Sequence, residues 1–343
     1  MKTNSKILSA TLALSMSASV AWSAAYKDPV PMKDGSQASI ADLKNDGDLR
    51  IAYMPPATEF NYYIAIGEGI KAAAESEDIE VFMLAPQSGA DINGQMGMIQ
   101  DVITQDVDAI ILSTHDEAAA APLVSRAVEK GIAVVIVNSD IADFPTPVHG
   151  VVGYSQREGT RQIGKYLSEM SGGSPLKVGV IEGQPGYHST ERVGGFLDGI
   201  ETSKNIEVVA SIAGGWNVEG GNIAGMDLLQ ANPDVDVLFA ANDYMIMGAA
   251  LASKALGKSD LILLGNDGDT AALEEISNGK IKATVNTLPF IMGEIALEVT
   301  LDTLKGEFPG GFVQTSTMIT DETNVLDLLQ DPDSLYPKPS KEY

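Results

Sequence analysis

The 343-residue sequence contains no cysteine. Disulfides, thiol nucleophiles and cysteine metal ligands are therefore excluded, and so is a lipoprotein signal, which needs a cysteine to acylate. Basic residues are also scarce, because 22 lysines and arginines stand against 47 acidic residues, for a formal net charge of −25. Such a charge repels phosphate backbones and anionic membranes, so we expect no nucleic-acid partner.

Residues typical of catalytic and metal sites are few. The three histidines, His115, His149 and His188, lack the spacing of metal ligands, and no Gly-x-Ser-x-Gly sequence is present. Asp267-Gly268-Asp269 is too short for a calcium loop. His115 and His188 fall near candidate ligand loops, but a structural or surface role is favoured for both. We therefore expect no enzyme activity, no catalytic residue, no metal and no cofactor.

Residues 1–23 have the three parts of a secretory signal peptide. Lys2 and Lys6 precede an apolar stretch from Ile7 to about Val20, and Ala21-Trp22-Ser23 supplies small residues for cleavage. The alternative is an uncleaved membrane anchor, but the stretch is rich in Ser and Ala and shorter than the roughly 20 strongly apolar residues of a span. We expect cleavage and export, most simply to a bacterial periplasm.

A short pattern occurs twice in the chain. Asp106-Val107-Asp108 begins an apolar run that ends at Asp116, and Asp234-Val235-Asp236 begins a second that ends at Asp243, each followed by an alanine-rich stretch. A buried parallel strand that ends in polar groups delivers them to the carboxyl edge of its sheet, where open α/β folds bind ligands. The repeat predicts two similar lobes that face one site.

Apolar runs rich in β-branched residues alternate with alanine-rich helical stretches, which is the pattern of repeated βα units. The predicted fold class is α/β, with two similar doubly wound parallel-sheet lobes. We assign residues 48–153 and 287–314 to an N-terminal lobe. A C-terminal lobe takes residues 154–286 with part of 315–343.

Three hinge crossings are expected between the lobes, near Gly153–Ser155, Val285–Thr287 and Gln314–Ser316. A strand around Val313–Met318 is predicted to return to the first lobe. The proline-containing tail from Gln330 is interpreted as a loosely packed extension.

Aromatic residues cluster in two predicted loops. Phe60, Tyr62 and Tyr63 follow the first predicted strand, and Trp216 follows Gly214-Gly215. Rings on loops can offer flat faces to a ligand, and Trp216 could stack against the C–H side of a sugar. The alternative for each ring is that it is buried at the end of a hydrophobic core. We favour the cleft for Trp216 and for at least one of the other rings.

Acidic and amide side chains directly follow three predicted strands, at Asp116, Asn242 and Asp267. Each could simply cap the helix that comes next. The agreement of three strand ends across two lobes favours ligand contact instead. Because a carboxylate accepts charge-assisted hydrogen bonds from adjacent hydroxyls, this set suits a polyhydroxy ligand.

At these residues the chain resembles the periplasmic sugar-binding proteins of ABC transporters, the ribose-binding type of the type I periplasmic-binding fold. The resemblance extends from about Leu49 to Met318. Its more specific stretches are residues 107–111, 239–243, 265–268 and 278–284.

The resemblance implies a role for each candidate residue. By position, Tyr62 and Tyr63 replace paired phenylalanines, Asp116, Asn242 and Asp267 match residues that bind sugar hydroxyls, and Trp216 matches a stacking ring. Two positions depart from the family pattern: Thr190 stands where the family has a ligand-binding arginine, and Thr287 where it has a glutamine. Arg192 keeps a neighbouring arginine to which a structural role is assigned. Ribose is therefore not specifically implied, and another monosaccharide, a polyol or another small hydroxylated compound is as consistent.

The resemblance also implies the function, which is that of a monomeric solute-binding component of an ABC importer. Its two lobes would close on a sugar or polyol by hinge bending and deliver it to a permease in the inner membrane. One alternative is ligand presentation to a chemoreceptor, a sensor kinase or a quorum-signal uptake system. A sugar-responsive repressor would need a DNA-binding helix pair at the amino end, where this chain has a signal sequence. An enzyme could use Asp116 and Asp267 as paired carboxylates, but we expect no turnover.

Overall fold

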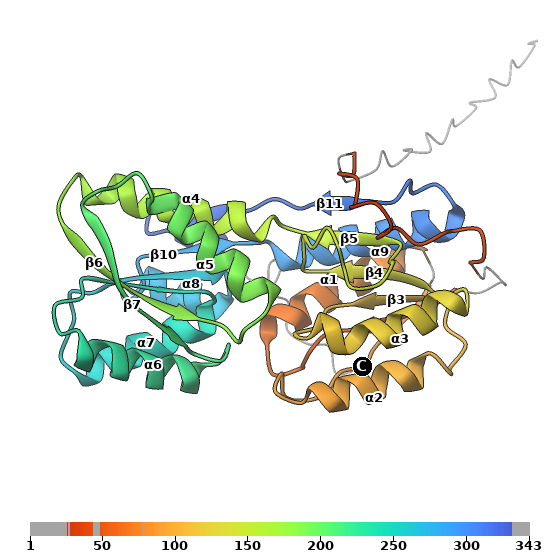
Figure 1. The fold of residues 1–343 in the computed structure, drawn as a ribbon, viewed down its shortest axis with the longest axis horizontal. Coiled ribbons are helices and arrows are strands. Elements are labelled where there is room, and N and C mark those ends of the chain that lie inside the picture. The colour runs from red at the N-terminus through yellow and green to blue at the C-terminus, as the bar shows by residue number, and fades with distance from the viewer. Residues whose placement is uncertain (1–25, 27, 44–48, 78, 331–343) are drawn as a thin grey trace, which may run out of the picture.

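The chain folds into two lobes that lie side by side (Figure 1). The computed structural model describes residues 26, 28–43, 49–77 and 79–330, so the expected signal peptide and the tail beyond Gln330 lie outside the described residues. Each lobe contains one six-stranded sheet with helices on both faces. This architecture confirms the predicted α/β fold with two doubly wound lobes.

The sheet of the N-terminal lobe is parallel throughout, in the order β11-β5-β4-β3-β1-β2. Its strands are β1 (Arg50–Met54), β2 (Glu80–Met83), β3 (Ala109–Leu112), β4 (Ala133–Val137), β5 (Gly150–Gly153) and β11 (Phe312–Gln314). Side chains alternate across the sheet. Ile51 and Tyr53 therefore pack in the cluster that includes α1 (Asn61–Glu77) and α9 (Pro289–Lys305). Ala52 and Met54 pack with α2 (Ile92–Val102) and α3 (Glu117–Glu129) on the other face.

The sheet of the C-terminal lobe has the order β12-β10-β9-β8-β6-β7, and only β12 is antiparallel to its neighbour. Its strands are β6 (Leu176–Glu182), β7 (Ile206–Ala213), β8 (Val237–Ala240), β9 (Ile262–Asp267), β10 (Ala283–Asn286) and β12 (Met318–Asp321). Val237 and Phe239 face α4 (Gln156–Ser171) and α5 (Tyr187–Ile200), where the rings of Phe196 and Phe239 stack with centroids 4.1 Å apart. The opposite face is covered by α6 (Val218–Ala231), α7 (Asp243–Ala255) and α8 (Thr270–Ser277), and α10 (Val325–Leu328) packs beside α8.

Helix starts near the cleft are set by short polar side chains. Five helices, α2, α3, α6, α7 and α8, begin after an Asp or Asn whose side chain accepts a backbone N–H bond: Asp91, Asp116, Asn217, Asn242 and Asp269. Such a cap stabilises a helix by about 1 kcal/mol. These caps fix where the loops between strands and helices end, and those loops carry the candidate site.

The repeated Asp-Val-Asp pattern has the same structural role in both lobes. The carboxylate of Asp108 accepts the backbone N–H of Arg50 at 2.7 Å, at the start of β1. The carboxylate of Asp236 accepts the backbone N–H of Lys177 at 2.8 Å, near the start of β6. Each aspartate thus ties the entry of one central strand to that of its neighbour.

The three crossings between lobes lie where the sequence predicted them. They connect β5 to α4, β10 to α9, and β11 to β12. The expectation of one strand around Val313–Met318 in the first lobe is wrong. The stretch is two strands, because β11 pairs with β5 of the N-terminal lobe and β12 pairs with β10 of the C-terminal lobe. The residues between β11 and β12 are polar and partly β-branched, so the sequence pattern indicated one continuous strand.

Residues 28–43 precede the predicted lobe boundary at residue 48 and pack on the N-terminal lobe (Figure 1). Val30 forms a bridge with Phe312, and Gln37 forms one with Val148. The side chain of Gln37 donates to the His149 carbonyl at 2.6 Å and accepts the Gly311 N–H at 3.1 Å. This segment therefore covers strand β11, which would otherwise be an exposed sheet edge.

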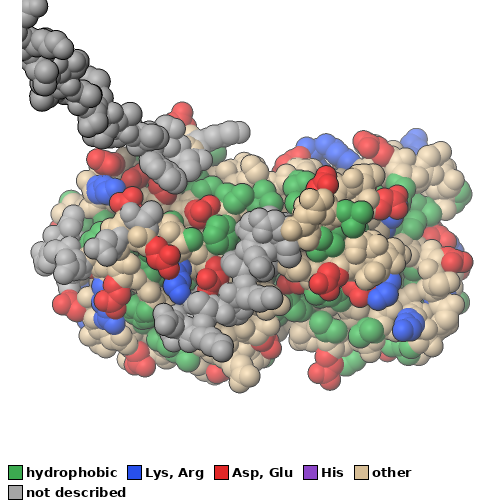
Figure 2. Space-filling view, turned by 180° about the vertical axis from the view of Figure 1, so that it is seen from behind, with side chains coloured by type: hydrophobic (Ala, Val, Ile, Leu, Met, Phe, Trp, Pro, Cys, Tyr) green, Lys and Arg blue, Asp and Glu red, His purple; other side chains and the backbone are tan. Residues whose placement is uncertain are grey.

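The surface is acidic over both lobes on the face shown in Figure 2, with lysines and arginines scattered among the carboxylates. That face shows no continuous basic patch, in agreement with the net charge of −25. Within the described residues, no helix has the length and apolar character needed to span a bilayer.

Candidate functional site

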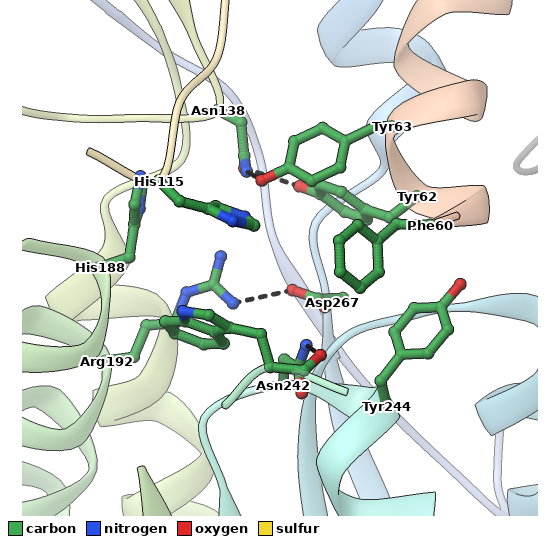
Figure 3. Close-up of a pocket in the computed structure, with 11 residues that line it drawn as sticks. Phe60, Tyr62, Tyr63, His115, Asn138, His188, Arg192, Asn242, Tyr244 and Asp267 are labelled. Carbon is green, nitrogen blue, oxygen red and sulfur yellow. Dashed lines mark hydrogen bonds and ion pairs between the residues drawn. The ribbon is translucent and has the colours of Figure 1, made fainter. Parts of the chain in front are cut away.

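The carboxyl ends of strands from both sheets surround a cavity between the lobes. Eleven side chains line it: Phe60, Tyr62, Tyr63, His115, Asn138, His188, Arg192, Trp216, Asn242, Tyr244 and Asp267. Its volume is about 30 Å³, room for little more than one or two waters, each of which needs about 10–15 Å³. The lobes are therefore closed tightly around this space. Figure 3 shows the side chains that line it.

The aromatic residues of the first loop form one wall of the cavity (Figure 3). The rings of Tyr62 and Tyr63 meet edge to face with centroids 5.4 Å apart, and Phe60 meets Tyr63 at 6.0 Å. The Tyr62 hydroxyl lies 2.8 Å from Asn138 Oδ1 and 2.9 Å from Thr287 Oγ1. Burial raises the pKa of Tyr62 well above its ordinary value. Since its hydroxyl has two protein partners, Tyr62 offers mainly its ring to a ligand.

An ion pair between Arg192 and Asp267 forms the opposite wall (Figure 3). Arg192 Nη1 donates to Asp267 Oδ1 at 3.0 Å, and the two side chains are only 5% and 7% exposed. Arg192 also donates from Nη1 to the Ala241 carbonyl and from Nε to Gln156 Oε1, at 3.0 and 2.6 Å. No hydrogen-bond partner of Nη2 lies in the described part of the chain. This atom is thus a donor available to a ligand.

The loop that carries Asp267 is held by a second buried carboxylate. Asp243 accepts the backbone N–H groups of Gly268 and Asp269 at 2.7 and 2.8 Å and the Thr284 hydroxyl at 2.6 Å. Burial raises the pKa of Asp267 to about 6, while Arg192 and Asn266 oppose the shift. Burial also raises the pKa of Asp243, with the nearby charge of Asp267 adding to it. Asp243 therefore positions the site without lining it.

Trp216 and Asn242 come from neighbouring loops of the C-terminal lobe. The Trp216 ring lies 5.4 Å from the Arg192 guanidinium carbon, within the range of a cation–π contact. Asn242 donates from Nδ2 to the Trp216 carbonyl at 3.0 Å, and its Oδ1 accepts the N–H of Met245 at 2.9 Å. Asn242 thus lines the cavity but also acts as the predicted helix cap and fixes the Trp216 backbone.

Backbone strain is concentrated at this site. Five non-glycine residues of the described chain have positive φ, and three of them, Asn138 (62°), Trp216 (71°) and Asp267 (132°), line the cavity. Such conformations cost on the order of 1–3 kcal/mol each and persist where the surrounding structure enforces them. The strained backbone therefore points to a functional requirement for these side-chain positions.

Gly183 makes room for the Trp216 ring, because a Cβ added there would lie 2.0 Å from Cζ2 of the indole. We expect Gly183→Ala to destabilise the protein by about 1–3 kcal/mol through overpacking and to displace Trp216. Gly97→Ala is the matched control, since a Cβ there meets no atom within 4 Å and alanine favours a helix by about 1 kcal/mol. Urea unfolding of both variants checks this. Equal stabilities would contradict the tight fit at Gly183.

Both cavity histidines are half-buried and neutral near pH 7. Burial lowers the pKa of His115 to about 4 and that of His188 well below its ordinary value. His188 Nδ1 is buried without a hydrogen-bond partner in the described structure, and its Nε2 lies 3.7 Å from Glu117 Oε1. Arg192 is therefore the cavity's permanent cation, and His188 Nδ1 is a second polar atom that a ligand could satisfy.

Three predicted contact residues lie elsewhere. Asp116 points along the chain to cap α3, accepting the Ala119 N–H at 2.8 Å, and its neighbour His115 lines the cavity instead. Thr190 is exposed on α5, so we remove it from the proposed contacts. Thr287 is buried behind Tyr62 and also bonds to the Asp267 carbonyl at 3.2 Å. It supports the wall and does not line the cavity.

Five lining residues were not among the predicted contacts: His115, Asn138, His188, Arg192 and Tyr244. His115, His188 and Arg192, for which structural or surface roles were favoured, all line the cavity. A signal for two of them was present, because His188 and Arg192 are four residues apart on one helix and share a face. Thr190 is two residues from Arg192, about 200° away around the helix axis, so both cannot face the cleft.

The described residues contain no group of three or more His, Asp or Glu side chains that could hold a metal ion. The cavity combines one ion pair, aromatic faces and neutral polar atoms. It is suited to binding a small uncharged molecule with hydroxyl groups.

Comparison with known proteins gives a consistent result. The model of the periplasmic binding protein domain family matches residues 51–308. The D-ribose/D-allose-binding protein of Pseudomonas aeruginosa is 27% identical over 271 residues, which cover 76% of this chain and 83% of that protein.

Two solved structures are similar over most of the chain. One is an ABC transporter periplasmic solute binding protein from Actinobacillus succinogenes with bound D-allose, with a TM-score of 0.76, 25% identity, and coverage of 82% of this chain and 100% of that one. The other is an ABC transporter solute binding protein from Mycobacterium smegmatis with bound glycerol, with a TM-score of 0.76, 26% identity, and coverage of 82% and 97%. These relatives are binding proteins, not enzymes, which confirms the expectation drawn from the sequence.

Proposed function

The chain belongs to the periplasmic binding protein domain family, and from this premise we propose that it binds a small polyhydroxylated ligand between its lobes. The ligand is a monosaccharide or a polyol, and the loaded protein delivers it to an ABC permease in the inner membrane. The observation that carries the proposal is the buried Arg192–Asp267 pair, which faces a wall of aromatic rings across a closed interlobe cavity.

The chemistry of the pair fits hydroxyl groups. Asp267 accepts hydrogen bonds from ligand hydroxyls, and Arg192 Nη2 donates to a ligand oxygen. Each charge-assisted bond contributes about 1.5–3 kcal/mol. The rings of Phe60, Tyr63 and Trp216 exclude water and offer faces to C–H groups. A few such contacts account for micromolar binding, which corresponds to about −8 kcal/mol.

Hydrogen bonds between the lobes contribute to the closed form. The Tyr244 hydroxyl of the C-terminal lobe accepts the Asn61 N–H of the N-terminal lobe at 3.0 Å, and Tyr187 donates to Asp140 Oδ1 at 3.0 Å. These bonds break when the lobes separate at the three crossings. A ligand that touches both lobes stabilises the closed form over the open form, and its differential affinity sets the extent of closure.

The cellular location, the oligomeric state and the partners are proposed from the sequence. With the predicted signal peptide removed, the protein acts in the periplasm as a monomer, with no nucleic-acid partner. The relatives whose names describe ribose, allose and apiose binding support a sugar or polyol as the ligand.

Thermal denaturation with and without candidate sugars, polyols and sugar acids tests the proposal. A ligand present at 100 times its Kd stabilises the folded protein by about 2.7 kcal/mol, and calorimetric titration then gives its affinity. If no compound of these classes changes the melting temperature, the proposed function is wrong.

Ligand affinity is expected to fall at acidic pH. Because burial raises the pKa of Asp267 to about 6, its carboxylate is ionised at pH 7.5 and about 90% protonated at pH 5, which weakens binding about tenfold. His115, with a pKa of about 4, and His188, whose pKa is lower than usual, stay neutral over this range. Titration calorimetry at both pH values measures the effect.

Two other buried carboxylates, Asp243 and Asp269, also have raised pKa values because of burial, but neither lines the cavity. The variant Asp267→Asn therefore serves as the control. Its residual affinity should not vary between pH 5 and 7.5. A variant that keeps the wild-type pH profile would assign the effect to another carboxylate with a raised pKa, such as Asp243, Asp269 or Glu117 beside His188.

A further inference from the structure

A second cavity adjoins the first and is much larger. Its volume is about 350 Å³, against about 30 Å³ for the inner cavity. The two share three lining residues, Phe60, His115 and Trp216. The larger space is thus an outer chamber of the same interlobe cleft, separated from the inner one by these rings.

The three shared rings form a partition contributed by both lobes. The ring of His115 meets that of Phe60 edge to face at 6.1 Å and stacks with Trp216 at 6.5 Å, with an interplanar angle of 26°. Among the described residues, the His115 ring has one hydrogen-bonding contact, a long one of 3.4 Å from Nδ1 to the Gly89 carbonyl. Trp216 is fixed by its N–H bond to Met245 Sδ and its carbonyl bond to Asn242. His115 is therefore the ring that a ligand extending through the partition would displace.

The remaining walls of the outer chamber carry hydroxyl-binding groups from both lobes. Glu59 and Ser88 come from the N-terminal lobe, and Gln184, Asn217 and Glu219 come from the C-terminal lobe. Glu59 is held in place because its Oε1 accepts the Gly89 N–H at 2.7 Å and the Ser88 hydroxyl at 3.2 Å. Carboxylate and amide oxygens beside aromatic faces are the same combination that the inner cavity offers.

Size indicates what the outer chamber can hold. Pockets for small molecules typically measure about 300–1,000 Å³, so the outer chamber has room for a sugar ring as it stands, whereas the inner cavity accepts one only when the lobes move apart from this closed form. We infer that the cleft has two subsites and that the outer chamber binds a second hydroxylated unit. The ligand class then includes disaccharides and glycosides of polyols. This inference rests on the proposed function and extends it.

The test compares matched one-unit and two-unit ligands by titration calorimetry. The pairs are glycerol with glucosylglycerol, D-glucose with trehalose, and D-fructose with sucrose. A variant, Ala90→Trp, fills the outer chamber from an exposed loop position that lines it. Ala231→Trp, at the exposed far end of α6, is the matched control.

The two-subsite cleft predicts that at least one two-unit ligand binds wild-type protein at least tenfold more tightly than its one-unit partner. Ala90→Trp should remove that advantage and leave one-unit affinity within twofold, and Ala231→Trp should change neither. The inference is overturned if only one-unit ligands bind, or if Ala90→Trp weakens both kinds equally; in either case the proposed function stands. If neither kind of ligand binds and the thermal screen of sugars, polyols and sugar acids also finds no ligand, both proposals fail.

Discussion

Replacing Asp267 with asparagine is expected to weaken ligand binding at least about 100-fold while the fold is retained. The substitution keeps the size of the side chain and tolerates the strained φ of 132°. It removes the negative charge that strengthens hydrogen bonds from ligand hydroxyls. Loss of two charge-assisted bonds of about 1.5–3 kcal/mol each corresponds to a factor of at least 100. Titration calorimetry with a ligand from the thermal screen measures the loss.

The matched control is Asp116→Asn, which makes the same chemical change at the strand end of the other lobe. Asn caps a helix about as well as Asp, and Asp116 caps α3 without lining the cavity. Its affinity should stay within twofold of the wild type. If Asp116→Asn loses as much affinity as Asp267→Asn, the sequence-based assignment of Asp116 as a ligand contact is correct after all.

The fold could be predicted from the sequence because its signals are local. Buried parallel strands are continuous apolar runs, and each lobe repeats them with helices between. The crossings could be placed because each lies between two consecutive elements that were assigned to different lobes. The division of residues 312–321 into β11 and β12 could not be predicted. The pairing partners of these two strands lie more than 25 residues away and in different lobes.

The site was predictable in part, for a different reason. Strand ends mark the loops that carry contacts, so Phe60, Tyr62, Tyr63, Trp216, Asn242 and Asp267 were all identified and all line the cavity. The direction of a single side chain within a loop is not encoded by spacing. Asp116 and His115 are adjacent, and the capping bond of Asp116 turns it toward α3 while His115 faces the cleft.

Arg192 shows the limit of aligning positions with a family pattern. The alignment placed the family's ligand-binding arginine at Thr190, two residues before Arg192. Helix geometry, however, puts position 192 on the same face as His188. The ion pair with Asp267 spans 75 residues of sequence. Such a contact depends on how α5 packs beside β9, which only the three-dimensional structure reveals.

Replacing Arg192 with methionine is expected to lower the free energy of unfolding by about 3–5 kcal/mol, because it leaves the Asp267 carboxylate buried without its partner. Ligand binding should be lost as well. Arg157→Met is the matched control, since Arg157 pairs with Asp198 at 2.6 Å but is 45% exposed. Exposed pairs typically contribute about 1 kcal/mol or less. Urea denaturation of both variants measures the difference.

The double variant Arg192→Met, Asp267→Asn separates the effect of the ion pair on stability from its effect on ligand binding. With both charges removed, no buried carboxylate remains unpaired, and most of the lost stability should return. Binding should stay absent, because the ligand has lost both its charged acceptor and its charged donor. If the double variant is as unstable as Arg192→Met alone, the cost lies in the packing of the guanidinium against Trp216 and Tyr154, at 5.4 and 5.7 Å. Arg192 would then stabilise the site through its contacts with the rings and not through its charge.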